Sequence, residues 1–327
     1  MNYDRWNNYR EYLLEKYGTS LYRVGVDGGF SCPNRTKERE GGCTFCDGTG
    51  SIAVYQRTNE SAFRHDSSFD EEVSEEVLLR FQSIESQIKQ GLQFIQRRYK
   101  AKLAALYFQS WTNTYDSTEN LKRIYDLALS CGDFSQFIVS TRPDCVGEDV
   151  ADLLAQYITP EREVWVELGL QSASDETLKR INRGHTLSDY ITCAERLHKR
   201  GIKICTHVII GLPGEERKDF IKTAEALNQV GSEGVKIHNL HIPGGTRMAQ
   251  DYLDGEIVSW STERYMNEVQ YFLRLLNPGM IVQRLVCETP AHRLMAPRHF
   301  MDKSLFLRTL NDKMERDDTR QGDLYEG

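Results

Sequence analysis

Short apolar runs alternate with helical patterns from about residue 100 onward, and this alternation restricts the fold more than any other feature. Near-continuous apolar segments such as Leu103–Gln109 and Glu163–Leu170 are typical of strands that are buried on both faces. Helical patterns follow them, and two of these end at Gly132 and Gly201. Such an alternation indicates a parallel sheet covered by helices. The sequence therefore predicts an α/β fold, a partial parallel (β/α) barrel of about six or seven strands.

Polar residues follow several of the expected strands directly. Gln109 and Ser110 end one strand, Ser140 ends the next, and Gln171 ends a third, while His241 lies near the end of a later one. The carboxyl ends of parallel strands meet at one edge of a barrel, where barrel enzymes assemble their active sites. We therefore expect the functional residues at this edge.

Four parts are expected along the chain: an N-terminal helical extension (1–20), the partial barrel (21–250), a C-terminal helix and strand completing it (251–311), and a flexible charged tail (312–327). No apolar run reaches the roughly 18 residues of a membrane helix, and the N-terminus lacks the apolar segment of a secretory signal. We expect a cytoplasmic protein that does not bind membranes. The net charge of −7 argues against strong non-specific binding of nucleic acid but leaves local basic patches open.

Three of the eight cysteines, Cys32, Cys43 and Cys46, are clustered with the spacing C-x10-C-x2-C. Sites built from thiolates usually close with four ligands, whether they hold zinc or an iron–sulfur cluster. Zinc would require a fourth Cys or His, whereas a four-iron cluster with three protein ligands leaves one iron for a cofactor. The other five cysteines are scattered and are expected to be small buried side chains.

The segment "CPNRTKEREGGCTFC" resembles the cluster loop of radical S-adenosylmethionine (SAM) enzymes. Its long first spacing and its flanks resemble the Elp3-like subgroup, and the length of the chain resembles a short single-domain branch without the acetyltransferase domain. The resemblance implies a [4Fe-4S] cluster on Cys32, Cys43 and Cys46, with SAM on the open iron. It also implies reductive cleavage of SAM to a 5′-deoxyadenosyl radical, which abstracts hydrogen from the substrate.

Two further segments carry the resemblance. Val166–His185 resembles the fourth-strand motif of the family, which implies that Gln171 contacts SAM and that Arg183 pairs with its carboxylate. Thr206–Glu215 resembles the turn beside the adenine, where His207 matches a polar position.

The end of the second strand, "YFQSWTNTY", departs from the "GGE" of many relatives, and the partner of the SAM amino group stays open. The candidates there are Gln109 and Ser110, and Ser140 follows on the next strand. Three residues are candidates for the reaction itself. Cys287 would donate to or quench a radical, Arg284 would bind an anionic group of the substrate, and His241 would face the barrel. The alternative for each is a structural role, and for Cys287 a buried thiol.

The resemblance favours tRNA as the substrate, with modification of the carbon-5 side chain of the wobble uridine by loss of a carboxymethyl group to leave aminomethyl. The first alternative is a small molecule such as a tetrapyrrole, and the second is a non-catalytic metal-binding RNA adaptor. The expected partners are an electron donor such as a flavodoxin or ferredoxin, and tRNA. Basic patches and aromatic residues near the N-terminus would contact the tRNA, unless those aromatics form a helix that packs on the barrel (Tyr3, Trp6, Tyr9, Tyr12).

Overall fold

The computed structural model describes residues 5–36, 41–48 and 84–327. Seven strands form one curved sheet in the order β1-β2-β3-β4-β5-β6-β8, and every neighbouring pair is parallel. This arrangement confirms the predicted α/β half-barrel. The strands are β1 (Leu21–Val26), β2 (Leu103–Phe108), β3 (Gln136–Thr141), β4 (Glu163–Gln171), β5 (Lys203–Ile210), β6 (Gly234–Asn239) and β8 (Ile281–Arg284).

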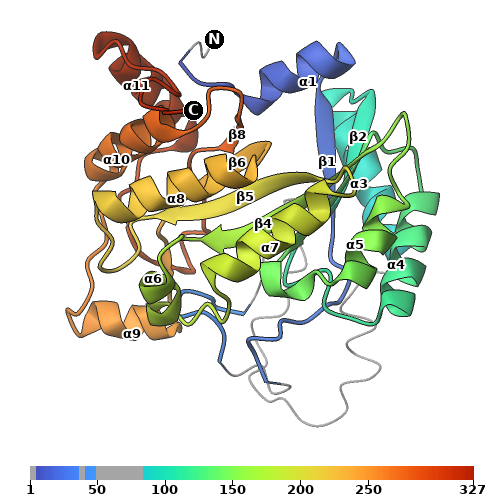
Figure 1. Cartoon of the computed structure of the whole chain (residues 1–327), viewed down its shortest axis with the longest axis horizontal. Helices are drawn as coiled ribbons and strands as arrows, with labels where there is room; N and C mark the ends of the chain where they lie inside the picture. Colours follow the sequence, from blue (N-terminus) through green and yellow to red (C-terminus); the bar gives the residue numbers. More distant parts are fainter. Residues whose placement is uncertain (1–4, 37–40, 49–83) are drawn as a thin grey trace.

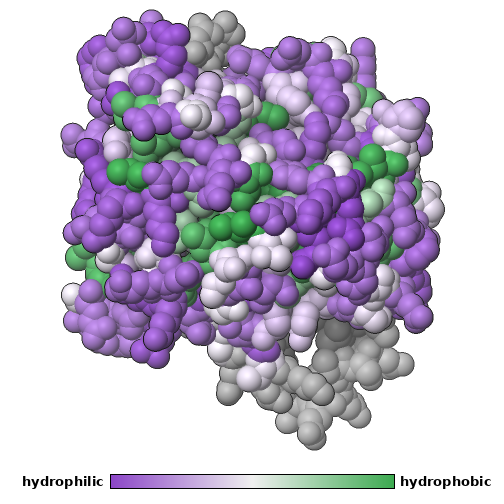
Figure 2. Space-filling model, viewed as in Figure 1, coloured by the Kyte–Doolittle hydropathy of each residue, from purple (hydrophilic) through white to green (hydrophobic). Residues whose placement is uncertain are grey.

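Amphipathic helices cover the outer face of the sheet (Figure 1). In α4, for example, Leu121, Tyr125 and Ala128 are fully buried while the polar face looks outward, and the space-filling view of this side is mostly hydrophilic (Figure 2). This is the pattern expected of helices that pack one apolar stripe on a sheet. The larger helices are α3 (Ile84–Tyr99), α4 (Thr118–Ser130), α5 (Glu148–Ala155), α7 (Leu187–His198), α8 (Arg217–Val230) and α10 (Thr262–Leu275).

Small elements follow some of the strands at their carboxyl ends. A short 3-10 turn (Pro143–Cys145) and α6 (Asp175–Arg180) come directly after β3 and β4. The remaining elements are α9 (Arg247–Leu253) and a two-stranded antiparallel sheet of β7 (Ile242–Pro243) and β9 (Leu294–Ala296). The sequence analysis did not predict α9 or this small sheet.

The C-terminal residues are packed, so the prediction of a flexible charged tail was wrong. Helix α11 (Lys303–Arg316) enters the predicted tail, and its Met314 is fully buried. Gln321 is also buried, and its Nε2 donates to the carbonyls of Asn277 and Met280, each at 2.8 Å. A few buried side chains are therefore enough to fix a segment whose charged residues mostly remain in water.

Helix α1 (Tyr9–Tyr17) packs against the amino-terminal end of the barrel, away from the loop of residues 27–48 (Figure 1). The hydroxyls of Tyr12 and Tyr17 donate to the Glu163 carboxylate at 3.0–3.1 Å, and Lys16 and Lys203 form ion pairs with it. Burial raises the pKa of Glu163, but hydrogen bonds from the two lysines outweigh burial and lower it to about 2. The aromatic residues of α1 thus face the barrel, as in the packed-helix alternative, while Tyr3 lies outside the described residues.

We expect Glu163→Ala to lower the free energy of unfolding by about 2–3 kcal/mol, because it leaves the two lysines without their shared partner. The pKa of Glu163 is lower in the folded protein, so its contribution is present above about pH 4.5 and is lost as the pH falls toward 2. Urea unfolding at pH 7 and pH 3 measures both effects. Glu176→Ala, which removes an exposed i,i+4 partner of Arg180, is the control and should cost less than about 0.5 kcal/mol. Equal losses in the two variants would contradict the assigned role of Glu163.

Candidate active site

The loop with the three clustered cysteines is bound to segments that lie far from it in the sequence. The amide of Thr44 donates to the carbonyl of Ile181 at 3.0 Å, and the amide of Met248 donates to the carbonyl of Thr44 at 2.9 Å. Within the loop, the amide of Cys46 donates to the carbonyl of Cys43 at 2.9 Å, which closes a turn between the two cysteines. The loop is therefore held between the end of α6 and the start of α9.

Side chains strengthen this attachment. Asn182 donates to the carbonyl of Gly42 at 2.7 Å, and the Nε of Arg293 lies 2.9 Å from the Asp47 carboxylate. Gly42 has a φ of 90°, and an added Cβ would lie 2.8 Å from the guanidinium of Arg35. Only glycine fits this backbone conformation and this close approach without strain.

The three thiols are free, and Cys43 is buried while Cys32 and Cys46 are half-buried. Within the described ranges, the only three potential metal-ligand atoms that all lie within 4.8 Å of one another belong to another group, on β4 and β5 (Glu167, Cys205 and His207). At least one pair of the loop sulfurs therefore lies more than 4.8 Å apart, which is wider than the roughly 3.8 Å between two thiolates on one tetrahedral zinc with a Zn–S distance of about 2.3 Å. Thiolates that bind different irons of one cluster are spaced more widely. This donor set fits a four-iron cluster better than zinc.

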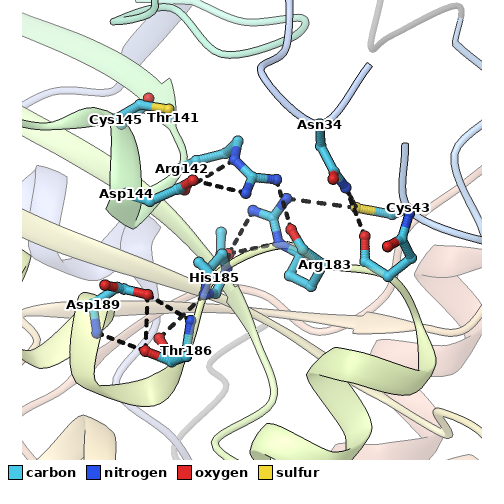
Figure 3. Close-up of polar contacts among 12 residues, drawn as sticks. Asn34, Cys43, Thr141, Arg142, Asp144, Cys145, Arg183, His185, Thr186 and Asp189 are labelled. Atoms are coloured by element: carbon cyan, nitrogen blue, oxygen red, sulfur yellow. Dashed lines mark hydrogen bonds and ion pairs between the residues drawn. The ribbon is translucent and has the colours of Figure 1, made fainter. Parts of the chain in front are cut away.

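Arg183 links the cysteine loop to the end of β4 (Figure 3). Its Nε and Nη2 donate to the carbonyl of Gly169 at 3.2 and 2.6 Å, and its Nη1 lies 3.6 Å from Cys43 Sγ. Arg142, held by Asp144 at 2.9 Å, donates to the carbonyl of Arg183 at 2.7 Å. Two buried guanidinium groups thus lie beside the cysteine loop.

Four of the predicted residues lie near the ends of β2, β3 and β4. By the alternation of side chains along a strand, Gln109 and Ser140 are on the inner face, as Tyr107 and Ile138 are. Gln171 follows an irregularity in the β4–β5 pairing and has a φ of 76°. Ser110 is buried, and its carbonyl accepts a hydrogen bond from Asn113 at 2.9 Å.

Gly169 lets Gln171 and Arg183 approach one another. A Cβ at this position would lie 2.6 Å from Arg183 Nη2 and 2.8 Å from Gln171 Nε2. The structure therefore brings two of the predicted cofactor-binding residues together beside Cys43.

The other predicted residues lie on, or shortly after, strands farther along the sheet. His207 Nε2 is 2.9 Å from the Glu167 carboxylate, and Arg284 Nη1 is 3.5 Å from a ring nitrogen of His238. Cys287 Sγ lies 3.7 Å from His241 Nδ1, and burial raises the pKa of Cys287 to about 12, so it is a protonated thiol at neutral pH. None of these four is hydrogen-bonded to the described part of the cysteine loop.

Several contributing residues were not among the predicted cofactor-binding or metal-binding residues. Arg142 and Asp144 follow β3, and Asn34 and Asn182 hold the cysteine loop through backbone contacts, Asn34 donating to the carbonyl of Asn182 at 2.6 Å. Arg142 stands at a strand end, which is a signal that sequence reasoning can use. The asparagine contacts join residues about 140–150 positions apart and leave no local signal.

Comparison with known proteins identifies the class. The model of the radical SAM superfamily matches residues 32–227, and that of the Radical_SAM C-terminal domain matches residues 232–316. The chain belongs to the radical SAM superfamily and is an enzyme of that class. Membership implies a [4Fe-4S] cluster and SAM, which the donor set of the loop fits, and it argues against a non-catalytic adaptor.

Two relatives match over most of their length. The uncharacterized protein YtqA of Bacillus subtilis is 31% identical over 323 residues, which cover 98% of this chain and 93% of that protein. Protein YhcC of Escherichia coli is 35% identical over 286 residues, which cover 87% and 84% of the two chains. These matches cover most of both chains, and the names of the two relatives state no substrate.

A structure of Elp3 from the archaeon Methanocaldococcus infernus superimposes with a TM-score of 0.65 at 19% identity, covering 76% of this chain and 62% of that chain. This likeness shows a shared fold. The tRNA uridine(34) acetyltransferase of the same organism is 27% identical over 157 residues, covering 47% of this chain and 28% of that protein.

Across the described residues, no helix has the length and apolarity needed to cross a membrane.

We expect Gly169→Ala to weaken SAM binding about tenfold or more while leaving the fold intact, because the new methyl group displaces Arg183 and Gln171. Equilibrium binding of SAM to the cluster-loaded protein measures the loss. Gly244→Ala is the matched control, since the nearest atom to its Cβ would be 3.8 Å away. Unchanged SAM affinity in Gly169→Ala would contradict the position assigned to the cofactor.

Glu215 accepts a hydrogen bond from Ser172, the residue that follows Gln171. It is 7% exposed, and burial raises its pKa to about 7. The folded protein therefore favours the neutral carboxyl, and the stability that this provides below about pH 4.5 is lost as the pH rises through 7.

We expect Glu215→Gln, which removes the buried charge, to raise the free energy of unfolding at pH 8 by about 2 kcal/mol relative to the unmodified chain. The gain should shrink toward zero near pH 5. Urea unfolding at several pH values measures it, with Glu225→Gln on the exposed face of α8 as a control that should show no such trend. A gain that is the same at pH 5 and pH 8 would rule out a raised pKa at Glu215.

Proposed function

We propose that this radical SAM enzyme modifies the carbon-5 side chain of the wobble uridine of tRNA, removing a carboxymethyl group to leave aminomethyl. The observation that carries the proposal is the Elp3-type loop, "CPNRTKEREGGCTFC", with its long first spacing. The matching stretch of a relative named tRNA uridine(34) acetyltransferase supports the same nucleotide.

In this proposal Cys32, Cys43 and Cys46 hold three irons of the [4Fe-4S] cluster, and Arg183 pairs with the carboxylate of SAM. The Nε and Nη2 of Arg183 donate to the Gly169 carbonyl, and its Nη1 lies 3.6 Å from Cys43 Sγ. In this proposal Nη1 is the atom that faces the cofactor. The reduced cluster and SAM together supply a 5′-deoxyadenosyl radical that removes a hydrogen atom. The remaining contacts to SAM are assigned to inner-face residues at the strand ends (Gln109, Ser110, Ser140, Gln171).

The proposed substrate suits hydrogen abstraction. The carboxymethyl carbon is bonded to a nitrogen, which stabilises a radical at that carbon, so the abstraction requires no general base. Return of one electron from this radical to the cluster would leave an imine and a proton, with SAM as the net two-electron oxidant. Hydrolysis of the imine after the radical step would break the C–N bond, release glyoxylate and leave the aminomethyl group. The protein has to orient this one C–H bond and exclude water. Helix α1 contributes to this by packing Tyr9 and Tyr12 against the apolar side chains of the inner face, at the end of the barrel opposite the cysteine loop.

The basic patches contribute unequally to the proposed RNA surface. Arg200 is paired with Asp152 and Arg293 with Asp47, so these cations are already neutralised. The exposed basic side chains on α3 and near the C-terminus remain for contacts with phosphates (Arg97, Arg98, Arg298, Arg308). A flavodoxin or ferredoxin is the proposed electron donor.

The test uses the full chain, reconstituted anaerobically with iron and sulfide, reduced, and incubated with SAM and tRNA from a strain lacking the gene. We expect 5′-deoxyadenosine by chromatography and conversion of the carboxymethylaminomethyl nucleoside to the aminomethyl nucleoside by mass spectrometry. Cys43→Ala should abolish both products, and Cys131→Ala, on the outer helical layer, should keep both. Formation of 5′-deoxyadenosine with unaltered tRNA would refute the tRNA substrate.

A further inference from the structure

The inner face of the barrel carries a buried charge cluster that SAM binding as proposed above does not use. At its centre is Glu167 on β4, which is fully buried. Its carboxylate pairs with Arg23 of β1 at 2.9 Å and with Lys236 of β6, and it accepts hydrogen bonds from Tyr107 at 2.7 Å and from His207 at 2.9 Å. Side chains from four strands thus converge on one carboxylate.

The charges of this cluster do not balance. Burial raises the pKa of Glu167, but the charges of Lys236 and Arg23 outweigh burial and hold it well below the usual range. Burial, with Arg23, lowers the pKa of Lys236 to about 7, so its amine is only partly protonated at neutral pH. Arg23 alone balances the charge of the carboxylate, so any positive charge on Lys236 is in excess of it even before Arg284 is counted.

Arg284 adds a further cation to the same compartment. Its Nη1 is directed at the Nε2 of His238 at 3.5 Å, and no carboxylate of the described residues lies within 4.0 Å of its guanidinium. Arg284 is half-buried. A partly desolvated guanidinium without a counter-ion is a natural site for an anion.

His238 extends this site. Burial, with the charge of Arg284, lowers its pKa well below the usual range, so the ring is neutral. Since Nε2 faces the guanidinium as an acceptor, Nδ1 carries the proton and is available as a donor. The centroid of the His238 ring lies 5.4 Å from that of His207, which belongs to the charge cluster around Glu167.

The strand register places these residues in one row. Gly169 pairs with His207, His207 with Lys236, and Lys236 with Arg284, across β4, β5, β6 and β8. The row begins at the glycine that holds Arg183 and ends at Arg284, whose guanidinium has no carboxylate partner among the described residues. An anion at Arg284 would therefore lie across the barrel from the proposed cofactor contacts.

A metal ion is a weaker explanation of the cluster. Glu167, Cys205 and His207 offer three ligand atoms within 4.8 Å. However, Arg23 and Lys236 already occupy the carboxylate, and burial raises the pKa of Cys205 to about 12, so that it is not a thiolate. The surplus of positive charge repels a cation and favours an anion.

We propose that Arg284 and His238 bind a carboxylate group of the substrate inside the barrel, with Lys236 and Arg23 supplying positive charge behind it. The inference rests on the proposed function for the identity of that carboxylate, which is the carboxymethyl group of the wobble side chain. Fixing this group by a guanidinium places the adjacent C–H bond at a defined position in the barrel.

The first experiment tests the anion site without RNA. The cluster-loaded protein is kept oxidised, so that no turnover occurs, and its thermal unfolding midpoint is followed with sodium acetate and with neutral acetamide at constant ionic strength. Acetate should stabilise the protein more than acetamide does. In Arg284→Gln the apparent Kd for acetate should rise at least tenfold, as expected for the loss of a charge-assisted hydrogen bond. Arg284→Lys should keep part of the response, and Arg123→Gln on the outer helix α4 should keep all of it.

The same titration with saturating SAM separates two sources of the carboxylate. We expect SAM to change the apparent Kd for acetate less than twofold. Loss of the acetate response in the presence of SAM would mean that the cofactor carboxylate fills the site, and would overturn the proposal. Equal effects of acetate and acetamide on the unmodified chain would also overturn it.

The second experiment identifies the substrate group. Two synthetic anticodon stem-loops carry either 5-carboxymethylaminomethyluridine or 5-aminomethyluridine at the wobble position, and their Kd values are measured by fluorescence anisotropy with SAM present. The carboxylate form should bind at least tenfold more tightly, and Arg284→Gln should remove this preference while Arg123→Gln retains it. If acetate binds through Arg284 but the two stem-loops bind equally, the tRNA proposal fails and the anion site stands. If the preference persists in Arg284→Gln, Arg284 does not read the carboxylate.

Discussion

Parallel pairing of successive strands is the constraint on which the rest of this structure depends. Since every neighbouring pair from β1 to β8 is parallel, all seven carboxyl ends point to one edge of the sheet. Arg142 and Gln171 reach that edge from separate strands without any local relation in the sequence. The amino-terminal ends form the opposite edge, where α1 packs through the network around Glu163. The same pairing therefore places the candidate active site at one end of the barrel and the stabilising contacts of α1 at the other.

The carbonyl of Gly169 is the junction between this scaffold and the cysteine loop. A guanidinium held by two hydrogen bonds on a strand-end carbonyl cannot rotate freely, so Arg183 transmits the position of β4 to Cys43. Arg142 fixes the backbone of Arg183 from the neighbouring strand. The positive φ of Gln171 and the irregular pairing of β4 mark the same point, where a regular strand gives way to a binding surface.

Much of the fold could be predicted because the buried strands are continuous apolar runs. The predicted strands Leu103–Gln109 and Glu163–Leu170 nearly coincide with the observed β2 and β4. The β7–β9 pair was missed, because its strands have two and three residues and form only once the barrel places them together. The cysteines were identified from their spacing alone, since three thiols on one loop have few other uses. The charge cluster around Glu167 was not identified, because its members are single polar residues inside strands that are far apart in the sequence.

The attachment of the cysteine loop has a consequence for the order of events during synthesis. Residues 43–47 emerge from the ribosome early, but their anchors at Ile181, Met248 and Arg293 emerge much later. Until the last of these anchors has been synthesised, the loop with the three thiols lacks some of the contacts that fix its conformation. Cluster insertion is therefore expected to follow folding of the barrel. A carrier that delivers iron and sulfide would then act on a chain whose barrel has already formed.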